Sequence, residues 1–219
     1  MSLCDTLLIR VGTQAITLMR DVNPPGHGGR VLNISSVGGY IGNATRGFYN
    51  SAKFGQCFSV TALSPWSPMS HSARLVALEG FTEAFTKEML PEWNIKAVII
   101  EPGGFATEWS KSSMVHFPVP SAYDKPHAPS VRFRQMTAGA TVFTGDPRKA
   151  ARALIEVASL PDPPVRMQLG TDALMLVKAK ARRTIQDAER WADIAHSTDA
   201  DGVDREKIME KLSAVDVNK

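Results

Sequence analysis

The chain has 219 residues, enough for one domain with a sizeable core. Hydrophobic residues make up 43% and charged residues 21%, and no apolar run reaches the ~18 residues typical of a membrane span, so a soluble globular protein is expected. The net charge of +3 is small and the aromatic residues are not interleaved with basic ones, which argues against a nucleic-acid-binding protein.

The two cysteines, Cys4 and Cys57, have no metal-ligand spacing, and no metal site is expected. The first residues lack a basic stretch followed by a sustained apolar core, so no secretory signal is predicted. A reduced, cytoplasmic protein is the expectation from these features.

Residues 3–22 have apolar side chains at the spacing of one helical face, which predicts a helix. These positions are Leu7, Leu8, Val11, Ala15, Ile16 and Met19. Pro24, Pro25 and Gly26 end that helix and lead through a loop into the next segment.

Residues 29–53 combine a buried strand, a glycine-rich loop and the start of a helix. The strand ends in Ser35 and Ser36, where open α/β sheets bind ligands. Tyr49 and Lys53 are one helical turn apart, so the ammonium can lie near the phenol and bring its pKa toward the working range. An ordinary exposed helix pair is the alternative for these two residues considered alone.

This block resembles the active site of the short-chain dehydrogenase/reductase family, in which N-I-S-S is followed thirteen residues later by the tyrosine of Y-x-x-x-K. Here Tyr49 lies thirteen residues after Ser36. The resemblance implies an α/β fold of the Rossmann-like three-layer type with a parallel sheet. It also implies that Tyr49 is the general acid or base, that Lys53 lowers its pKa and binds ribose, and that Ser36 holds the substrate oxygen.

Two features of the family are absent before residue 29. The helix that normally carries a relay asparagine has Ile9 at that position. None of the sixteen glycines forms G-x-G-x-x-G or G-x-x-x-G-x-G, the turn that would hold a pyrophosphate at a helix N-terminus. Since the family has several β-α units before its serine strand, the chain is expected to be amino-terminally truncated by roughly a hundred residues.

A second departure follows Lys53. In the family the catalytic helix continues without a break, and joining Phe54 to Ala77 restores the run K-F-A-L-E-G-F-T-E. The intervening residues 55–76 contain Pro65 and Pro68, which would break a helix. Translated intron sequence is the hypothesis for this insertion, and a genuine surface loop is the alternative.

Residues 94–101 form a β-branched run typical of a buried parallel strand. Pro102, Gly103, Gly104 and Thr107 follow it and match the family's P-G-x-x-x-T, which lines the nicotinamide. By resemblance Thr107 contacts the cofactor and the glycines allow close backbone approach.

Residues 108–136 occupy the place of the family's mobile flap over the substrate. Its apolar residues Met114, Val115, Phe117 and Val119 would favour a hydrophobic alcohol or ketone, with plain loop packing as the alternative. His116 and His127 are interpreted as loop histidines, because no second ligand falls at metal spacing.

The remaining chain predicts a helix opened by Asp146 and Pro147, a strand over 165–169 and a helix through Ile194. Its basic residues are interpreted as a solvated helix face, because acidic residues follow directly. These residues are Lys178, Lys180, Arg182 and Arg183. We expect one partial domain over 1–196 with an insertion at 55–76, and a polar tail over 197–219 with one or two helical turns.

The resemblance implies hydride transfer between NADP or NAD, with NADP preferred, and a secondary alcohol or carbonyl on an apolar small molecule. The segment PEWNIKAVIIEPGGFATEW is most similar to fungal members, often found in secondary metabolism. A homodimer face is expected on the helix before the serine strand and the Tyr49 helix. The competing hypothesis is an inactive fragment with at most a dimerisation role, because its sheet would lack the strands that cover its edge.

Overall fold

The computed structural model describes residues 12, 14–54, 78–108, 118–138, 143 and 145–214. The chain divides into two compact units, Met1–Val177 and Lys178–Lys219, which are treated separately. Several predictions lie outside the described residues: those on Ile9, on the insertion at 55–76 and on Met114, Val115 and Phe117 of the flap. The predicted domain boundary after residue 196 stays a prediction.

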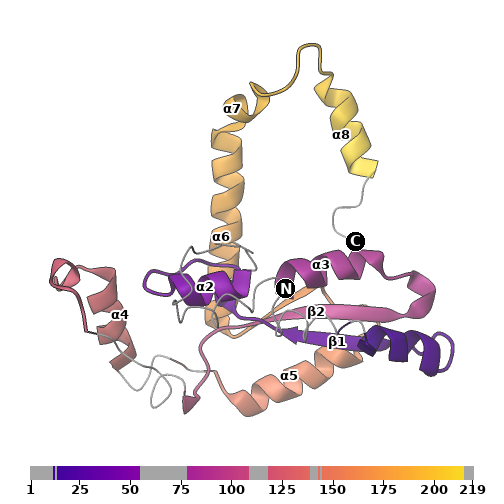
Figure 1. Ribbon diagram of the computed structural model, residues 1–219, viewed down its shortest axis with the longest axis horizontal. Coiled ribbons are helices and arrows are strands. Elements are labelled where there is room, and N and C mark those ends of the chain that lie inside the picture. The colour runs from indigo at the N-terminus through magenta and orange to yellow at the C-terminus, as the bar shows by residue number, and fades with distance from the viewer. Residues whose placement is uncertain are drawn as a thin grey trace, which may run out of the picture. The chain divides into compact units, whose positions relative to one another are not determined.

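The first unit is built on a parallel sheet of three strands in the order β1-β2-β3 (Figure 1). These are β1 (Gly29–Ile34), β2 (Ile95–Pro102) and β3 (Arg166–Leu169). In the register, Gly29 pairs with Ile95 and Ile99 pairs with Arg166. All three strands lie within one or two residues of their expected positions, so the parallel sheet is confirmed.

Helices cover both faces of this sheet, as Figure 1 shows for α3 (Leu78–Glu88) and α5 (Pro147–Ser159). Because side chains alternate along a strand, Ile95 and Ala97 of β2 point to one face and Val98 and Ile100 to the other. The first pair packs with Ile16 and Phe85, and the second pair packs with Val157 and Leu169. The expected three-layer arrangement is therefore confirmed.

The amino ends of the strands are tied together by Arg30. Its Nη1 donates to the carbonyl oxygen of Asn94 (2.9 Å) and its Nη2 to that of Pro161 (3.0 Å). Asn94 has a left-handed backbone (φ 49°), which asparagine tolerates better than most residues. These bonds close the end of the sheet opposite to the serine loop.

The helix ends differ in how well the sequence predicts them. Asp146 caps α5 as expected, accepting from the backbone N–H of Arg148 (2.8 Å), with Pro147 in the first turn. The helix before β1 ends in a π-turn over Leu18–Val22, closed by a bond from Asn23 N to Leu18 O (3.1 Å). That wider turn was not predicted from the spacing of apolar residues.

The segment that contains Tyr49 and Lys53 forms α2 (Gly47–Phe54). The predicted flap region contains a 3-10 turn (Ser121–Tyr123) and α4 (Pro129–Ala138). The last helices are α6 (Thr171–Arg190), α7 (Ala192–His196) and α8 (Arg205–Ala214). The predicted helix through Ile194 is thus interrupted at Trp191, and α8 is longer than the expected one or two turns.

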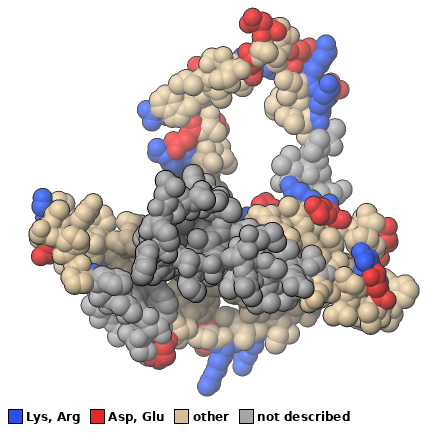
Figure 2. Space-filling view, viewed as in Figure 1, with Lys and Arg blue, Asp and Glu red and all other residues tan. Residues whose placement is uncertain are grey.

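Charges of both signs alternate over the second unit (Figure 2). Arg183 pairs with Asp187 one turn later (2.9 Å), and Lys207 pairs with Asp204 (3.2 Å). Lys178, Lys180, Arg182 and Arg183 of α6 are exposed, in agreement with a solvated helix face. No described helix is long and apolar enough to cross a membrane.

Candidate active site

The serine loop, residues 35–39, begins where β1 ends. Ser36 caps the 3-10 turn Val37–Gly39, and its Oγ accepts a hydrogen bond from the Gly38 N–H (3.1 Å). A hydroxyl has one proton to donate and can accept two bonds. Ser36 can therefore accept from Gly38 and still donate to a substrate oxygen.

Tyr49 lies against the same loop. A Cβ placed on Gly38 would lie 2.8 Å from Tyr49 Cε1, closer than side chains normally approach, so glycine is needed for this packing. Tyr49 is 37% exposed, which leaves it accessible to a ligand. Ser36 and Tyr49, thirteen residues apart in the sequence, thus meet at Gly38.

Lys53 lies one turn after Tyr49 on α2 and is half-buried. Burial lowers the pKa of its ammonium, and the charge of Glu79 on α3 raises it. A cation held beside a phenol favours the phenolate, the form that can remove a proton from an alcohol. The structure thus places Tyr49 and Lys53 one turn apart on α2, and their role as a proton-transfer pair stays a prediction.

Asn50 fixes this helix to the serine loop and is buried. Its Nδ2 donates to the carbonyl oxygens of Gly38 (2.8 Å) and Ile41 (2.9 Å), and its Oδ1 accepts from the Asn43 N–H (2.9 Å). All three bonds hold the loop next to Tyr49. The sequence analysis missed Asn50; its position directly after the tyrosine is the one signal that points to it.

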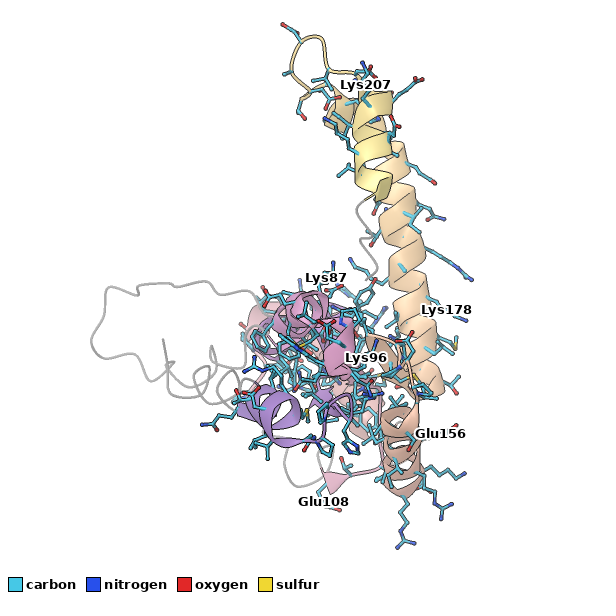
Figure 3. All side chains as sticks on the ribbon, turned by 90° about the vertical axis from the view of Figure 1, so that its right-hand side faces the viewer. Lys87, Lys96, Glu108, Glu156, Lys178 and Lys207 are labelled. Atoms are coloured by element: carbon cyan, nitrogen blue, oxygen red, sulfur yellow. The ribbon has the colours of Figure 1, made fainter. Side chains whose placement is uncertain are left out.

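The loop after β2 can be followed in Figure 3, where Lys96 near the strand's start and Glu108 after the loop are labelled. Gly103 N donates to Leu169 O (2.9 Å), and Gly104 N donates to Asp172 Oδ2 (2.7 Å). Side chains added to these glycines would collide with Asp172 and with Phe143. The two glycines therefore allow a close approach, and the groups that approach them are the side chains of Asp172 and Phe143.

The donors at this edge fit the ribose and nicotinamide half of a dinucleotide better than its phosphates. Tyr49 and Thr107 offer hydroxyl groups and Lys53 an ammonium, which suit ribose hydroxyls and a carboxamide. The backbone N–H groups of Gly103 and Gly104 are already bonded within the chain. The sequence has no glycine-rich turn opening a helix for the pyrophosphate.

A mostly apolar hollow of about 350 Å³ lies between the loop before α2 and the flap region. Its lining residues are Ala44, Thr45, Pro118, Val119, Pro120, Tyr123, Pro129, Ser130 and Arg134. Arg46 links it to the site, since its guanidinium lies 4.6 Å from the Phe133 ring centre on α4 and its charge interacts with Tyr49. His127 is exposed on this segment, as expected for a loop histidine.

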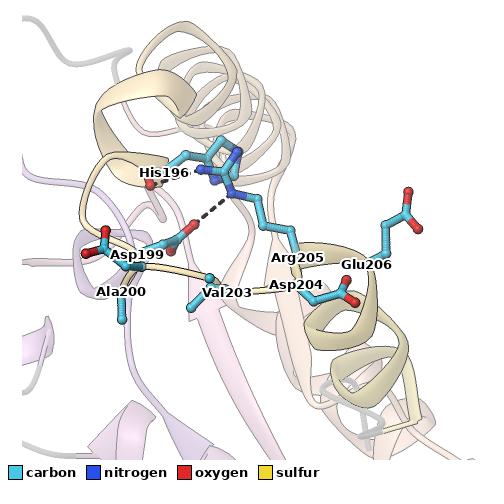
Figure 4. A pocket seen from close by; sticks show the side chains of 9 residues that line it. His196, Asp199, Ala200, Val203, Asp204, Arg205 and Glu206 are labelled. Atoms are coloured by element: carbon cyan, nitrogen blue, oxygen red, sulfur yellow. Dashed lines mark hydrogen bonds and ion pairs between the residues drawn. The ribbon is translucent and has the colours of Figure 1, made fainter.

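A second hollow, of about 490 Å³, lies in the second unit (Figure 4). Its charged side chains bond to one another: Arg205 donates to Asp199 Oδ2 (2.7 Å) and to the carbonyl oxygen of His196 (3.1 Å). Asp204 accepts from the Lys207 N–H at the start of α8 (3.2 Å). These bonds stabilise the turn between α7 and α8. Among the described residues no group of three or more His, Cys, Asp or Glu is placed to hold a metal ion.

The comparisons with known proteins point to one family, although no family model matches the chain. An uncharacterized oxidoreductase of Schizosaccharomyces pombe is 31% identical over 87% of this chain and 56% of its own length. The oxidoreductase CalM of Penicillium decumbens is 28% identical over 85% of this chain and 55% of its own length. A short-chain dehydrogenase of Streptomyces avermitilis has a solved structure that is 28% identical, with a TM-score of 0.62 over 87% of this chain and 58% of its own.

The chain belongs to the short-chain dehydrogenase/reductase family. The predicted family and its Rossmann-like fold are therefore confirmed. A 3-ketodihydrosphingosine reductase of Bacteroides thetaiotaomicron, 25% identical over 73% of this chain, is a further relative. The chain spans about half the length of the curated relatives it matches.

Within the short-chain dehydrogenase/reductase fold, the predicted site residues divide into two groups. Ser36, Tyr49 and Lys53 lie on the serine loop and α2, with Ser36 and Tyr49 in contact with Gly38. Pro102 ends β2 and Thr107 lies beyond the glycines on the next loop, at the same carboxyl edge of the sheet.

Proposed function

We propose that this protein is an NAD(P)-dependent oxidoreductase that interconverts a secondary alcohol and a ketone or aldehyde on an apolar small molecule. The observation that carries the proposal is the meeting of Ser36 and Tyr49 at Gly38, with Lys53 one turn further along α2. The relatives named as oxidoreductases support the reaction class. Of the two cofactors, we propose NADP rather than NAD.

In the direction of reduction, the Tyr49 hydroxyl donates a proton to the carbonyl oxygen as that oxygen gains negative charge. Ser36 donates a hydrogen bond to the same oxygen and stabilises the developing charge. The Lys53 ammonium stabilises the phenolate left on Tyr49 and, with Thr107, would hold the ribose and nicotinamide. The nicotinamide cofactor supplies the hydride.

The apolar hollow beside the flap supports an apolar substrate, because Val119 and three prolines line it. The bacterial relative is named a 3-ketodihydrosphingosine reductase, and this name supports a ketone as the proposed substrate group. Relatives in Penicillium and Botryotinia support a fungal setting, and secondary metabolism is the setting proposed here. A cytoplasmic homodimer is the proposed state of the protein.

The alternative is a chain without activity, favoured by the absence of a glycine-rich pyrophosphate turn from the sequence. Titration of the full chain with NADPH, followed by cofactor fluorescence, separates the two. The oxidoreductase proposal predicts a saturable change in fluorescence and NADPH oxidation with a panel of apolar ketones. No fluorescence change and no turnover on the panel would leave the inactive chain as the better account.

Tyr49→Phe tests the role of the hydroxyl. Because general acid catalysis contributes about 10²-fold or more, the variant should lose at least that factor in kcat while it still binds NADPH. Tyr40→Phe is the matched control, since it removes a tyrosine hydroxyl but keeps the ring that faces Arg166. Equal loss in both variants would show that Tyr49 is not the proton donor.

A further inference from the structure

A cluster of charged side chains lies beneath the serine loop. Arg166 of β3 donates through Nη1 to Glu79 Oε2 (2.7 Å) and to Glu101 Oε1 (2.6 Å). Its Nη2 donates to Glu83 Oε2 (3.2 Å). The cluster, here called the Arg166 cluster, consists of Arg166, Glu79, Glu83, Glu101, Gln168 and Ser35.

Both central carboxylates are buried with their oxygens bonded. The side chain of Glu79 is 4% exposed and that of Glu101 is fully buried. The second oxygen of Glu101 accepts from Gln168 Nε2 (2.8 Å), and the second oxygen of Glu79 accepts from Ser35 Oγ. A buried ion pair of this kind adds little stability compared with apolar packing, which favours a role beyond stabilising the core.

Glu79 is in direct contact with the loop that carries Ser36. It bonds to Ser35, the neighbour of Ser36, and a Cβ on Gly39 would overlap its Oε1. Gly39 is therefore required for the approach of this carboxylate. Glu79 thus contacts both the first and the last residue of the serine loop.

Glu79 also acts on Lys53. The cluster has three carboxylates and one guanidinium, so its charge is negative, and Glu79 favours the protonated form of Lys53. Joining Phe54 to Ala77 in the sequence would place Glu79 four residues after Lys53, the spacing of an ion pair on one helical face. In a chain joined in this way the two residues would lie on one face of a single helix.

We propose that Glu79 is a positioning residue of the active site: held by Arg166, its carboxylate fixes the serine loop and sets a negative charge close to Lys53 of α2. This inference rests on the proposed function, because the importance of Ser36 and Lys53 comes from it. The charged and titratable groups around Glu79 are Arg166, Glu101 and Glu83 of the cluster, Lys53 of α2, and Tyr40, whose ring faces Arg166.

The test is the pH dependence of Lys53 acetylation by acetic anhydride in the full chain, followed by mass spectrometry. In Glu79→Gln the midpoint should move to lower pH, because a cation that loses an anionic neighbour gives up its proton more readily. Glu79→Asp keeps the charge and should stay near the wild-type midpoint. Glu88→Gln, which removes an exposed carboxylate of the same helix outside the Arg166 cluster, is the matched control and should leave the midpoint unchanged.

An unchanged midpoint in folded Glu79→Gln would overturn the proposal, as would equal shifts in the Gln and Asp variants. If the Gln variant does not fold, Ser35→Ala removes only the link to the loop. It should lower kcat and leave KM for NADPH unchanged, and a wild-type kcat would overturn the positioning role. Labelling of Lys53 needs neither cofactor nor turnover, so it tests the role of Glu79 alone. Failure of the proposed function is detected by a different measurement, in which the wild-type protein does not bind NADPH.

Discussion

At the scale of residues, the site depends on Gly38. The backbone N–H of Gly38 bonds to Ser36, its carbonyl accepts from Asn50, and its missing side chain makes room for the Tyr49 ring. Gly38 is therefore in contact with both residues whose hydroxyl groups are proposed to bind the substrate oxygen. Proton transfer needs such fixed geometry, since a small displacement of the donor costs much of the rate.

Asn50→Ala should weaken both the fold and the site. The substitution leaves the buried carbonyl oxygen of Gly38, the partly buried one of Ile41 and the N–H of Asn43 without this partner. We therefore expect a loss of about 1–3 kcal/mol in the free energy of unfolding. Urea unfolding measures it. Asn43→Ala is the control, because Asn43 bonds to Asn50 through its backbone N–H, which the substitution keeps. A similar loss of stability in Asn43→Ala would contradict the role given to the Asn50 side chain.

Glu79 predicts a pH dependence of stability. Burial raises the pKa of its carboxyl above 4.5, although the bonds from Ser35 and Arg166 lower it. An acid whose pKa is higher in the folded than in the unfolded chain contributes stability fully below the unfolded pKa, and this is lost as pH rises through the folded pKa. The unfolding free energy of the wild type should therefore fall relative to Glu79→Gln as pH rises from about 4.5.

Urea unfolding of both proteins across this range measures the difference. A difference that stays constant, or that grows with pH, would contradict the raised pKa of Glu79.

Sequence spacing could predict Ser36, Tyr49 and Lys53, because thirteen and four residues are distances along one continuous segment. It could not predict Glu79, whose partners Ser35 and Arg166 lie 44 and 87 residues away. Such contacts depend on strand order and on side-chain direction across the sheet. For the same reason the cluster around Arg166 became visible only in the folded chain.

At the scale of elements, the strands were the most predictable part. β2 is a β-branched apolar run, β1 has an apolar centre, and β3 lies between Pro164 and Gly170; each was found within one or two residues of its expected bounds. The π-turn at Leu18–Val22 and the break at Trp191 were not predicted, because apolar periodicity does not report the hydrogen bonds of a helix. The contact of α6 with the loop after β2 was also not predicted, although Asp172 lies in the first turn of α6.

Asp172→Asn tests how α6 supports the loop after β2. Its carboxylate accepts from Gly104 N at 2.7 Å, so the weaker amide acceptor should loosen the loop while stability changes by about 1 kcal/mol or less. Under the proposed function, Kd for NADPH should rise. Asp187→Asn, in the exposed pair with Arg183, is the control for losing a charge and should leave Kd unchanged. An unchanged Kd in Asp172→Asn would show that this bond does not shape the cofactor site.

At the scale of the whole molecule, the chain spans about half the length of its curated relatives and has three strands in its described sheet. β1, the strand that leads into the serine loop, is an edge strand of that sheet. Helix α2 ends at Phe54 and helix α3 begins at Leu78, on either side of the predicted insertion. Whether residues 55–76 are intron sequence stays a prediction, and a spliced transcript that encodes them would contradict it.

Deleting residues 55–76 should raise the thermal stability of the protein. The deletion joins α2 to the sequence of α3 as one helix and puts Lys53 four residues before Glu79. We expect a higher Tm by circular dichroism, because a continuous helix removes two helix ends with unsatisfied backbone groups. A lower Tm would favour a genuine loop on which the fold depends.

The most direct test of the proposed chemistry is isotope transfer in the full-length chain. NADPH deuterated at its hydride-donating carbon is incubated with an apolar ketone, and the alcohol formed is analysed by mass spectrometry. We predict deuterium on the former carbonyl carbon with wild-type and Tyr40→Phe protein, and at least about 10²-fold less with Tyr49→Phe. The same yield of deuterated alcohol from wild-type and Tyr49→Phe protein, or none from the wild type, would contradict the account.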